Sequence, residues 1–141
     1  MKYWDSSALL ALLVREEQSD RLEELLGEDP AVVTWWGTSV ECVNALARLE
    51  RNQGLTPAAF RSALSTLTAA QGHWIEVPAS TPVREQALRL LRIHPLQAGD
   101  ALQLAAAMVA SGMQPAELQF VSLDERQSRA AEREGFPILI G

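Results

Sequence analysis

Hydrophobic positions along the chain follow two alternating patterns. Short apolar runs of β-forming residues occur at Lys2–Trp4, Ala31–Thr34, Trp74–Val77, Leu118–Ser122 and Pro137–Ile140. Between these runs, apolar residues recur every three or four positions, as they do on the buried face of an amphipathic helix. Leu22, Leu25 and Leu26 form one such face. The sequence therefore predicts the order β-α-α-β-α-α-β-α-α-β-α-β.

Strands that alternate with helices predict a parallel sheet covered by helices on both faces. We therefore expect an α/β fold of three layers, α/β/α, with a central parallel sheet of four to five strands. Pro137 has no N–H group to donate to a neighbouring strand, so the last strand is expected at a sheet edge. Ligands of such folds bind beyond the carboxyl ends of the strands, and we expect the chemistry there.

Length and composition indicate one domain spanning residues 1–141. Hydrophobic residues make up 48% of the chain and charged residues 21%, and no low-complexity stretch interrupts the pattern. Cys42 is the only cysteine, which excludes an internal disulfide framework and leaves a thiolate zinc site without a second cysteine. This composition is typical of a protein in a reducing cytoplasm.

Charge and hydropathy indicate whether the chain could bind a membrane or nucleic acid. No apolar run reaches the roughly 18 residues of a membrane span, and charges at Asp5 and at 15–17 are unlike a signal peptide, so we expect no membrane association. The net charge of −6 argues against binding nucleic acid by bulk electrostatics alone. Eleven of the twelve basic residues are arginine, which suits phosphate contacts, although a GC-rich genome would produce the same bias.

Four acidic residues are expected at the carboxyl edge of the sheet. Asp5 follows the first strand and Asp124 the fourth, and parallel strands end at the same edge. Glu41 lies in the first turn of the helix after the second strand, and Asp100 begins the long apolar helix that leads to the fourth strand. The sequence therefore predicts that these four carboxylates lie together.

Each acid also has a purely structural explanation. Asp5 and Asp124 could cap helix N-termini, and Asp100 could complement a helix dipole. Thr38 and Glu41 have the spacing of a capping box. The four together are harder to explain in this way, because three of them adjoin strongly apolar runs, where an unpaired charge is costly.

Clustered carboxylates repel one another unless a cation neutralises them. Oxygen-only ligands favour Mg²⁺ or Mn²⁺, whereas zinc usually recruits histidine or cysteine. The two histidines, His73 and His94, show no ligand spacing and are expected at the surface or at strand ends. A hard-cation site of this kind suits phosphodiester hydrolysis, in which the metal activates water and screens the charge that develops on the phosphate.

Four segments of the chain resemble one known family. In order, they are "YWDSSALLALL", "TSVECVNALARL", "HPLQAGDALQLAAA" and "FVSLDERQSRAAEREGF". They resemble the PIN-domain ribonucleases, most closely the VapC toxins of type II toxin–antitoxin (VapBC) systems, and the likeness runs from Asp5 to Phe136. It implies a PIN-like fold and a ribonuclease that depends on Mg²⁺ or Mn²⁺. Its catalytic and metal-binding residues would be Asp5, Glu41, Asp100 and Asp124.

The resemblance also implies supporting residues and partners. Ser122 matches the small hydroxyl residue of the family's T/S-x-D pattern, and Ser6 follows the first acid. Both are expected to orient water or a carboxylate, or else to satisfy backbone groups at a strand end. VapC-like proteins commonly form homodimers and are inhibited by a VapB-like antitoxin that blocks the acidic site. Family members cleave particular tRNAs or ribosomal RNA, and no residue here selects between them.

Arginines on two helices are candidates for binding RNA. Arg126, Arg129 and Arg133 share one helix face next to Asp124, so they are expected to contact phosphates or to form a solvated face paired with glutamates. Arg48, on the helix that carries Glu41, is a weaker candidate of the same kind.

The leucine-rich first two helices, together with Trp35 and Trp36, are expected to be mostly core. Any surplus apolar face there is the candidate groove for an antitoxin or a second protomer.

Other enzyme classes lack their defining residues. A response-regulator receiver needs a lysine after its last strand, and the only lysine is Lys2. A haloacid-dehalogenase phosphatase carries D-x-D where this chain has "DSS", and a serine hydrolase carries a G-x-S-x-G turn that is absent here. Two alternatives stay open: a non-catalytic PIN-like protein-binding module, and a PIN nuclease that acts in RNA processing outside a toxin system.

Overall fold

The computed structural model of the chain describes residues 1–140 as five strands and seven α-helices built around one sheet. The strands are β1 Lys2–Trp4, β2 Val32–Trp35, β3 Ile75–Val77, β4 Phe120–Ser122 and β5 Ile138–Ile140. The helices are α1 Ser6–Leu13, α2 Ser19–Glu28, α3 Thr38–Arg51, α4 Pro57–Gln71, α5 Thr81–Ile93, α6 Ala98–Ala110 and α7 Glu125–Arg133. A short 3-10 helix spans Pro115–Glu117.

The strands form one sheet in the order β3-β2-β1-β4-β5, and every neighbouring pair is parallel. Tyr3 of β1 aligns with Val33 of β2 on one side and with Phe120 of β4 on the other. β5 lies at a sheet edge, as the preceding Pro137 predicts. Because β1 is the central strand, the residue that follows it emerges in the middle of the carboxyl edge.

The predicted order of strands and helices is confirmed, and so is the α/β/α arrangement with a parallel sheet. β1 has the predicted bounds, whereas each of the other strands begins one or two residues later than expected. The difference arises because a flanking residue can contribute a single carbonyl to the sheet. Ala31, for example, accepts a hydrogen bond from the Lys2 N–H but precedes the first residue of β2.

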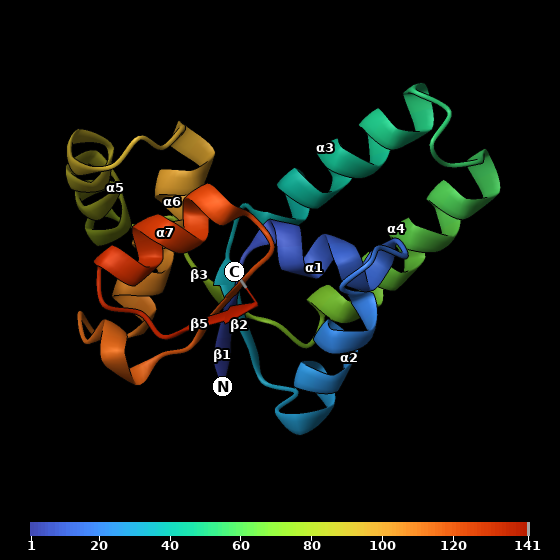
Figure 1. Cartoon of the computed structure of the whole chain (residues 1–141). Coiled ribbons are helices and arrows are strands. Elements are labelled where there is room, and N and C mark those ends of the chain that lie inside the picture. The colour runs from blue at the N-terminus through green and yellow to red at the C-terminus, as the bar shows by residue number, and fades with distance from the viewer. Residues whose placement is uncertain (141) are drawn as a thin grey trace.

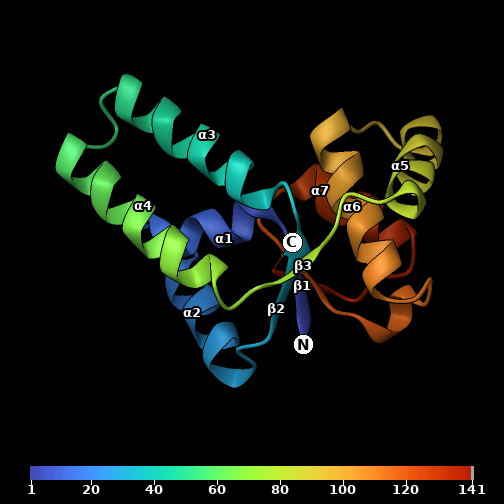
Figure 2. The same cartoon turned by 180° about the vertical axis from the view of Figure 1, so that it is seen from behind.

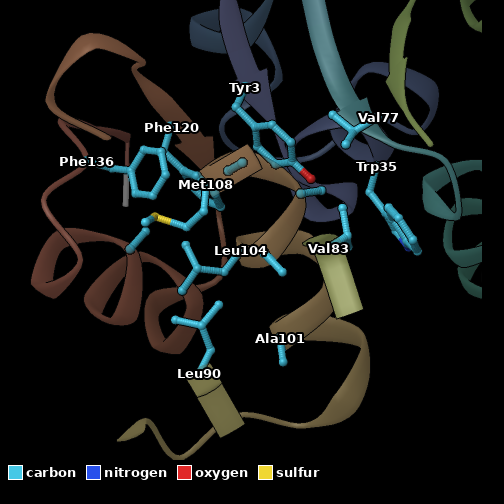
Figure 3. Close-up of a cluster of buried hydrophobic side chains, with 14 of the residues drawn as sticks. Tyr3, Trp35, Val77, Val83, Leu90, Ala101, Leu104, Met108, Phe120 and Phe136 are labelled. Carbon is cyan, nitrogen blue, oxygen red and sulfur yellow. The ribbon is translucent and has the colours of Figure 1, made fainter. Parts of the chain in front are cut away.

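Successive residues of each strand point to opposite faces of the sheet and contribute to two separate cores. On one face Tyr3, Val33 and Phe120 pack with residues of α5, α6 and α7, and the rings of Tyr3 and Phe120 stack with centroids 5.2 Å apart (Figure 3). On the other face Trp4 and Val121 pack with residues of α1, α2 and α4. The alternation along β1 therefore anchors Asp5 between two packed layers.

Helices cover the two faces of the sheet as separate groups. Helices α5, α6 and α7 lie on one side and α1, α2 and α4 on the other, and both views show α3 and α4 extending together away from the sheet (Figures 1 and 2). In α6, seven residues between Ala101 and Met108 are buried, yet its 13 residues span only about 20 Å at 1.5 Å each. No helix within residues 1–140 is long and apolar enough to cross a membrane.

Candidate active site

Four acidic side chains lie where helices start at the carboxyl edge of the sheet. Asp5 follows β1, and Asp124 lies between β4 and α7 as the N-cap of that helix. Glu41 lies in the first turn of α3, and Asp100 in the first turn of α6. Figure 1 shows these helices starting near the upper end of the sheet. The topology therefore brings the four predicted acids to one region.

Asp5 is the most buried of the four, with 3% of its surface exposed. Its Oδ1 accepts hydrogen bonds from the Ser7 hydroxyl at 2.6 Å and from the Ala8 backbone N–H at 3.0 Å. Its Oδ2 accepts a hydrogen bond from the Ser122 hydroxyl at 2.5 Å. Asp5 therefore caps α1, as its structural explanation predicts, and it also retains an oxygen atom with a single hydrogen bond.

Glu41 is held from two sides. The Ser6 hydroxyl donates to Oε2 at 2.9 Å, and the Gln103 side-chain amide donates to Oε1 at 3.1 Å. The alternative capping box of Thr38 and Glu41 does not form, because Gly37 is the N-cap of α3. The Thr38 hydroxyl instead lies 2.7 Å from the Thr34 hydroxyl and accepts a hydrogen bond from Gln103. Side chains of α1 and α6 therefore fix the carboxylate of Glu41.

Asp100 and Asp124 are half-buried and belong to neighbouring helices. The Asp124 carboxylate accepts a hydrogen bond from the Gln127 backbone N–H at 3.1 Å and so caps α7. The side chain of Gln127 is buried and donates to the Asp100 carbonyl at 3.0 Å. Gln127 therefore ties the start of α6, which carries one acid, to the start of α7, which carries the other.

Burial and mutual repulsion disfavour the charged forms of three of these acids. Burial raises the pKa of Asp5 from 3.8 to about 6, and the charge of Asp124 adds to the rise. Burial likewise raises the pKa of Glu41, with a contribution from Asp100, and that of Asp100, with a contribution from Asp124. The charges therefore act between pairs of acids, Asp5 with Asp124, Asp124 with Asp100 and Asp100 with Glu41, and a nearby cation would stabilise the charged forms.

Three polar residues that hold the acids were not predicted: Ser7, Gln103 and Gln127. Gln103 is the one polar residue within the apolar run "ALQLAAAM" and is 1% exposed. A buried amide needs hydrogen-bond partners, so its position in this run was the available signal. Ser7 and Gln127 lie beside acids at helix starts, where sequence alone does not distinguish a capping position from a ligand-holding one.

A cavity of about 700 Å³ opens beside Asp100 and Asp124. Its walls come from the segment between α5 and α6 and from one face of α7, including the three predicted arginines Arg126, Arg129 and Arg133. Arg129 pairs with Glu125 at 2.5 Å, as expected for a solvated helix face. The lining of the cavity therefore combines carboxylates with arginines.

Other predicted residues lie apart from the acids. Arg48 is exposed on α3 and does not line the cavity.

The two histidines differ in their exposure. His73 is exposed, as predicted. The expectation of a surface or strand-end position is wrong for His94, which follows α5 and is 6% exposed. His94 Nε2 lies 2.7 Å from a Glu134 oxygen, and Arg89 pairs with the same carboxylate at 2.6 Å. The burial of His94 could not be predicted from the sequence, because its partner Glu134 lies 40 positions away.

The leucine-rich helices carry a second cavity. It has a volume of about 350 Å³ and lies among α1, α2, α4 and the start of β2, with Leu12 and Leu13 in its wall. Trp35 is buried, as predicted, but Trp36 is 59% exposed and does not belong to the core. The prediction is wrong for Trp36, which follows the last residue of β2 and so lies outside the sheet.

Among residues 1–140, no three histidine, cysteine, aspartate or glutamate side chains lie close enough to hold one metal ion. Asp5 faces its serine partners, and Glu41 faces Ser6 and Gln103, so the four acids share an edge without sharing a coordination point. The donor set nevertheless fits a hard divalent cation, because every donor is a carboxylate oxygen and Oδ2 of Asp5 keeps an acceptor position.

Carboxylates next to an arginine-lined cavity provide, side by side, groups that bind divalent cations and groups that bind phosphate. This combination suits chemistry at a phosphodiester. A family model described as the PIN domain matches residues 2–133 of the chain, which include all four acids and the three cavity arginines. No curated protein matches the chain.

Proposed function

The chain belongs to the PIN domain family, and from this premise we propose that it is an endoribonuclease that hydrolyses RNA phosphodiester bonds with Mg²⁺ or Mn²⁺. PIN domains are generally metal-dependent nucleases. The observation that carries the proposal is the group of four carboxylates at one sheet edge, three with a raised pKa, beside a cavity lined by arginines.

The proposal gives each acid a task. Asp5, Glu41 and Asp100 would hold the cation once the side chains of Glu41 and Asp100 turn toward Asp5, because without the ion no three acids lie close enough to share it. Asp124 would act either as a further ligand or through water. When bound, the cation would activate water for attack on phosphorus and screen the charge of the transition state. Ser6 and Ser122 would act as supports, since each donates a hydrogen bond to one of these carboxylates.

RNA would approach along the arginine-lined cavity. Arg126, Arg129 and Arg133 present guanidinium groups to the same cavity as Asp100 and Asp124. Guanidinium groups bind phosphate oxygens in pairs of hydrogen bonds, which would draw the backbone towards the acids despite the net charge of −6. The resemblance to VapC toxins implies transfer RNA or ribosomal RNA as the substrate. Arg48 has weaker support, because it lies outside this cavity.

We further propose that the protein is a VapC-type toxin whose single domain spans residues 1–141. This assignment rests on the resemblance of its four acidic segments to that group. The leucine-lined cavity among α1, α2 and α4 supports binding of a VapB-like antitoxin, because apolar side chains of a partner helix would fill it. A homodimer and a cytoplasmic location belong to the same proposal.

Purified protein incubated with total cellular RNA tests the nuclease proposal. We expect discrete fragments with Mg²⁺ or Mn²⁺, no fragments with EDTA, and loss of cleavage in Asp5→Asn and Asp100→Asn variants that keep their circular dichroism spectrum. Asp20→Asn is the matched control, because Asp20 is an exposed acid on α2 that pairs with Arg15, away from the four acids. Cleavage that survives both site substitutions would contradict the proposal.

The cleavage experiment distinguishes an enzyme from the first alternative, a non-catalytic protein-binding module, which would produce no fragments. The second alternative, a PIN nuclease of RNA processing outside a toxin system, would produce fragments that require metal. Expression of the gene alone distinguishes it from a toxin, because a toxin arrests growth and a co-expressed antitoxin restores it. Growth without arrest, in cells that contain active enzyme, would favour the processing nuclease.

A further inference from the structure

Two parallel chains of hydrogen bonds run from one loop to the two oxygens of Asp5. In the first, the Leu123 backbone N–H donates to Ser7 Oγ at 2.9 Å, and the Ser7 hydroxyl donates to Asp5 Oδ1 at 2.6 Å. In the second, the Asp124 backbone N–H donates to Ser122 Oγ at 3.0 Å, and the Ser122 hydroxyl donates to Asp5 Oδ2 at 2.5 Å. Both chains begin in the loop that carries the acid Asp124.

The direction of each chain is fixed by the number of protons. A serine hydroxyl has one proton to donate, whereas its oxygen can accept. Since a backbone N–H occupies the acceptor side of each hydroxyl, the proton of each serine is free to point at Asp5. The alternative contacts, between the Ser7 and Ser122 hydroxyls and from the Ser122 hydroxyl to the Asp124 carbonyl, are both longer, at 3.4 Å. The two serines therefore present two donors to one carboxylate.

The count of acceptor positions on Asp5 shows what these donors leave open. Oδ1 accepts from Ser7 and from the Ala8 N–H, which fills its two lone pairs. Oδ2 accepts from Ser122 alone. One acceptor position of the buried carboxylate therefore stays available, and it belongs to the oxygen on the Ser122 side.

We propose that Ser7 is a positioning residue for the divalent cation. It fixes the rotation of the Asp5 carboxylate, so that the open position stays on Oδ2, and it holds the Leu123–Asp124 loop, so that Asp5 and Asp124 move as one unit. The inference rests on the proposed function, because it requires that Asp5 bind a cation. Groups that orient a metal ligand typically change metal affinity by about 10- to 100-fold when they are removed.

Binding of Mn²⁺ to the full-length protein, measured by isothermal titration calorimetry and by electron paramagnetic resonance of free Mn²⁺, tests this role without RNA. We expect Ser7→Ala to raise the Kd for Mn²⁺ by about 10- to 100-fold. The matched control is Ser19→Ala. The buried Ser19 hydroxyl also accepts from a backbone N–H, that of Glu16, and donates onward, to the Ala11 carbonyl, but far from the acids.

Both variants are expected to lower the melting temperature, because each loses a similar pair of hydrogen bonds, and only Ser7→Ala should change the Kd. An unchanged Kd in folded Ser7→Ala protein would overturn the role of Ser7 while leaving the nuclease proposal intact. If Ser7→Ala does not fold, Ser7→Cys decides the question, since its weak thiol donor should raise the Kd and wild-type affinity would overturn the inference. Failure of the wild type to bind Mn²⁺ would overturn the role of Ser7, whereas the nuclease proposal is decided separately by RNA cleavage with Mg²⁺ against EDTA.

Discussion

Tyr3 and Gln103 are joined by a hydrogen bond of 2.6 Å between the phenol hydroxyl and the amide oxygen, although 100 positions separate them in the chain. Burial, with the charges of Asp5 and Glu41, holds the pKa of Tyr3 well above 10.0, so the phenol keeps the proton that it donates. The amide nitrogen of Gln103 donates to Thr38 and Glu41. A buried polar network therefore connects the centre of the sheet to one acid of the candidate active site.

Replacement of Gln103 tests this connection. We expect Gln103→Leu to lower the free energy of unfolding by about 1–3 kcal/mol, because the phenol of Tyr3 loses its acceptor, and to lower RNA cleavage, because Glu41 loses a donor. Tyr3→Phe is the control, since it removes one hydroxyl of the network but no contact to Glu41. Chemical denaturation and initial rates measure the two effects. Equal cleavage by both variants would contradict the assigned role of Gln103.

The raised pKa of Asp5 predicts how stability depends on pH. A carboxyl whose pKa rises from 3.8 to about 6 on folding stabilises the native state below about pH 4, and this contribution is lost as the pH rises through 6. The rise corresponds to about 3 kcal/mol. In EDTA, the free energy of unfolding of wild type should therefore fall relative to Asp5→Asn between pH 4 and 6 and then stay constant. Urea titrations at several pH values measure the free energy of unfolding. If this free energy depends on pH in the same way in wild type and Asp5→Asn, the raised pKa of Asp5 is contradicted.

Metal binding should restore, at neutral pH, the stability that is lost when the Asp5 carboxylate ionises. A ligand that binds the native state alone stabilises it by about 2.7 kcal/mol at a concentration of 100 times its Kd. We therefore expect Mn²⁺ to raise the melting temperature of wild type by several degrees and to leave that of Asp5→Asn nearly unchanged. Thermal unfolding followed by circular dichroism, with Mn²⁺ or EDTA, provides the comparison. A similar rise in both proteins would point to metal binding elsewhere.

The cavity arginines should act on substrate binding more than on chemistry. We expect the double variant Arg126→Ala and Arg133→Ala to raise KM for RNA with little change in kcat. The slope of the logarithm of affinity against the logarithm of salt concentration should fall by about 0.7 for each lost phosphate contact with a single strand. Arg21→Ala with Arg61→Ala is the control, since both arginines are exposed on other helices. An equal effect of the control pair would assign the change to net charge.

Trp35 is the last residue of β2 and Trp36 follows it, so substitutions at these two positions test where the core ends. Trp35 is 7% exposed and Trp36 is 59% exposed. We expect Trp35→Ala to lower the free energy of unfolding by about 3–5 kcal/mol and Trp36→Ala by less than about 1 kcal/mol. Guanidinium titrations of the two variants measure the difference. Equal losses would mean that Trp36 is covered in solution, as it would be in a dimer.

The sequence was most informative where one local pattern determines the structure. Alternating apolar runs predicted the strands, and an acid directly after a strand, such as Asp5 or Asp124, could be assigned to the carboxyl edge because parallel strands share a direction. Gln103 and His94 were missed because their burial depends on partners 62 to 100 positions away for Gln103 and 40 positions away for His94. Local periodicity contains no information about such partners.

The hydrogen bond between Asp5 and Ser122 spans 117 positions of the chain, and β1 pairs with β4 through the same late segment. During synthesis, the first acid leaves the ribosome long before the serine and the loop that orient it. A nascent chain therefore contains Asp5, Glu41 and Asp100 without the arrangement that joins them. If RNA cleavage is the activity, as proposed above, it should begin only once β4 is released and inserts beside β1, so a nascent chain that ends before β4 should not cleave RNA.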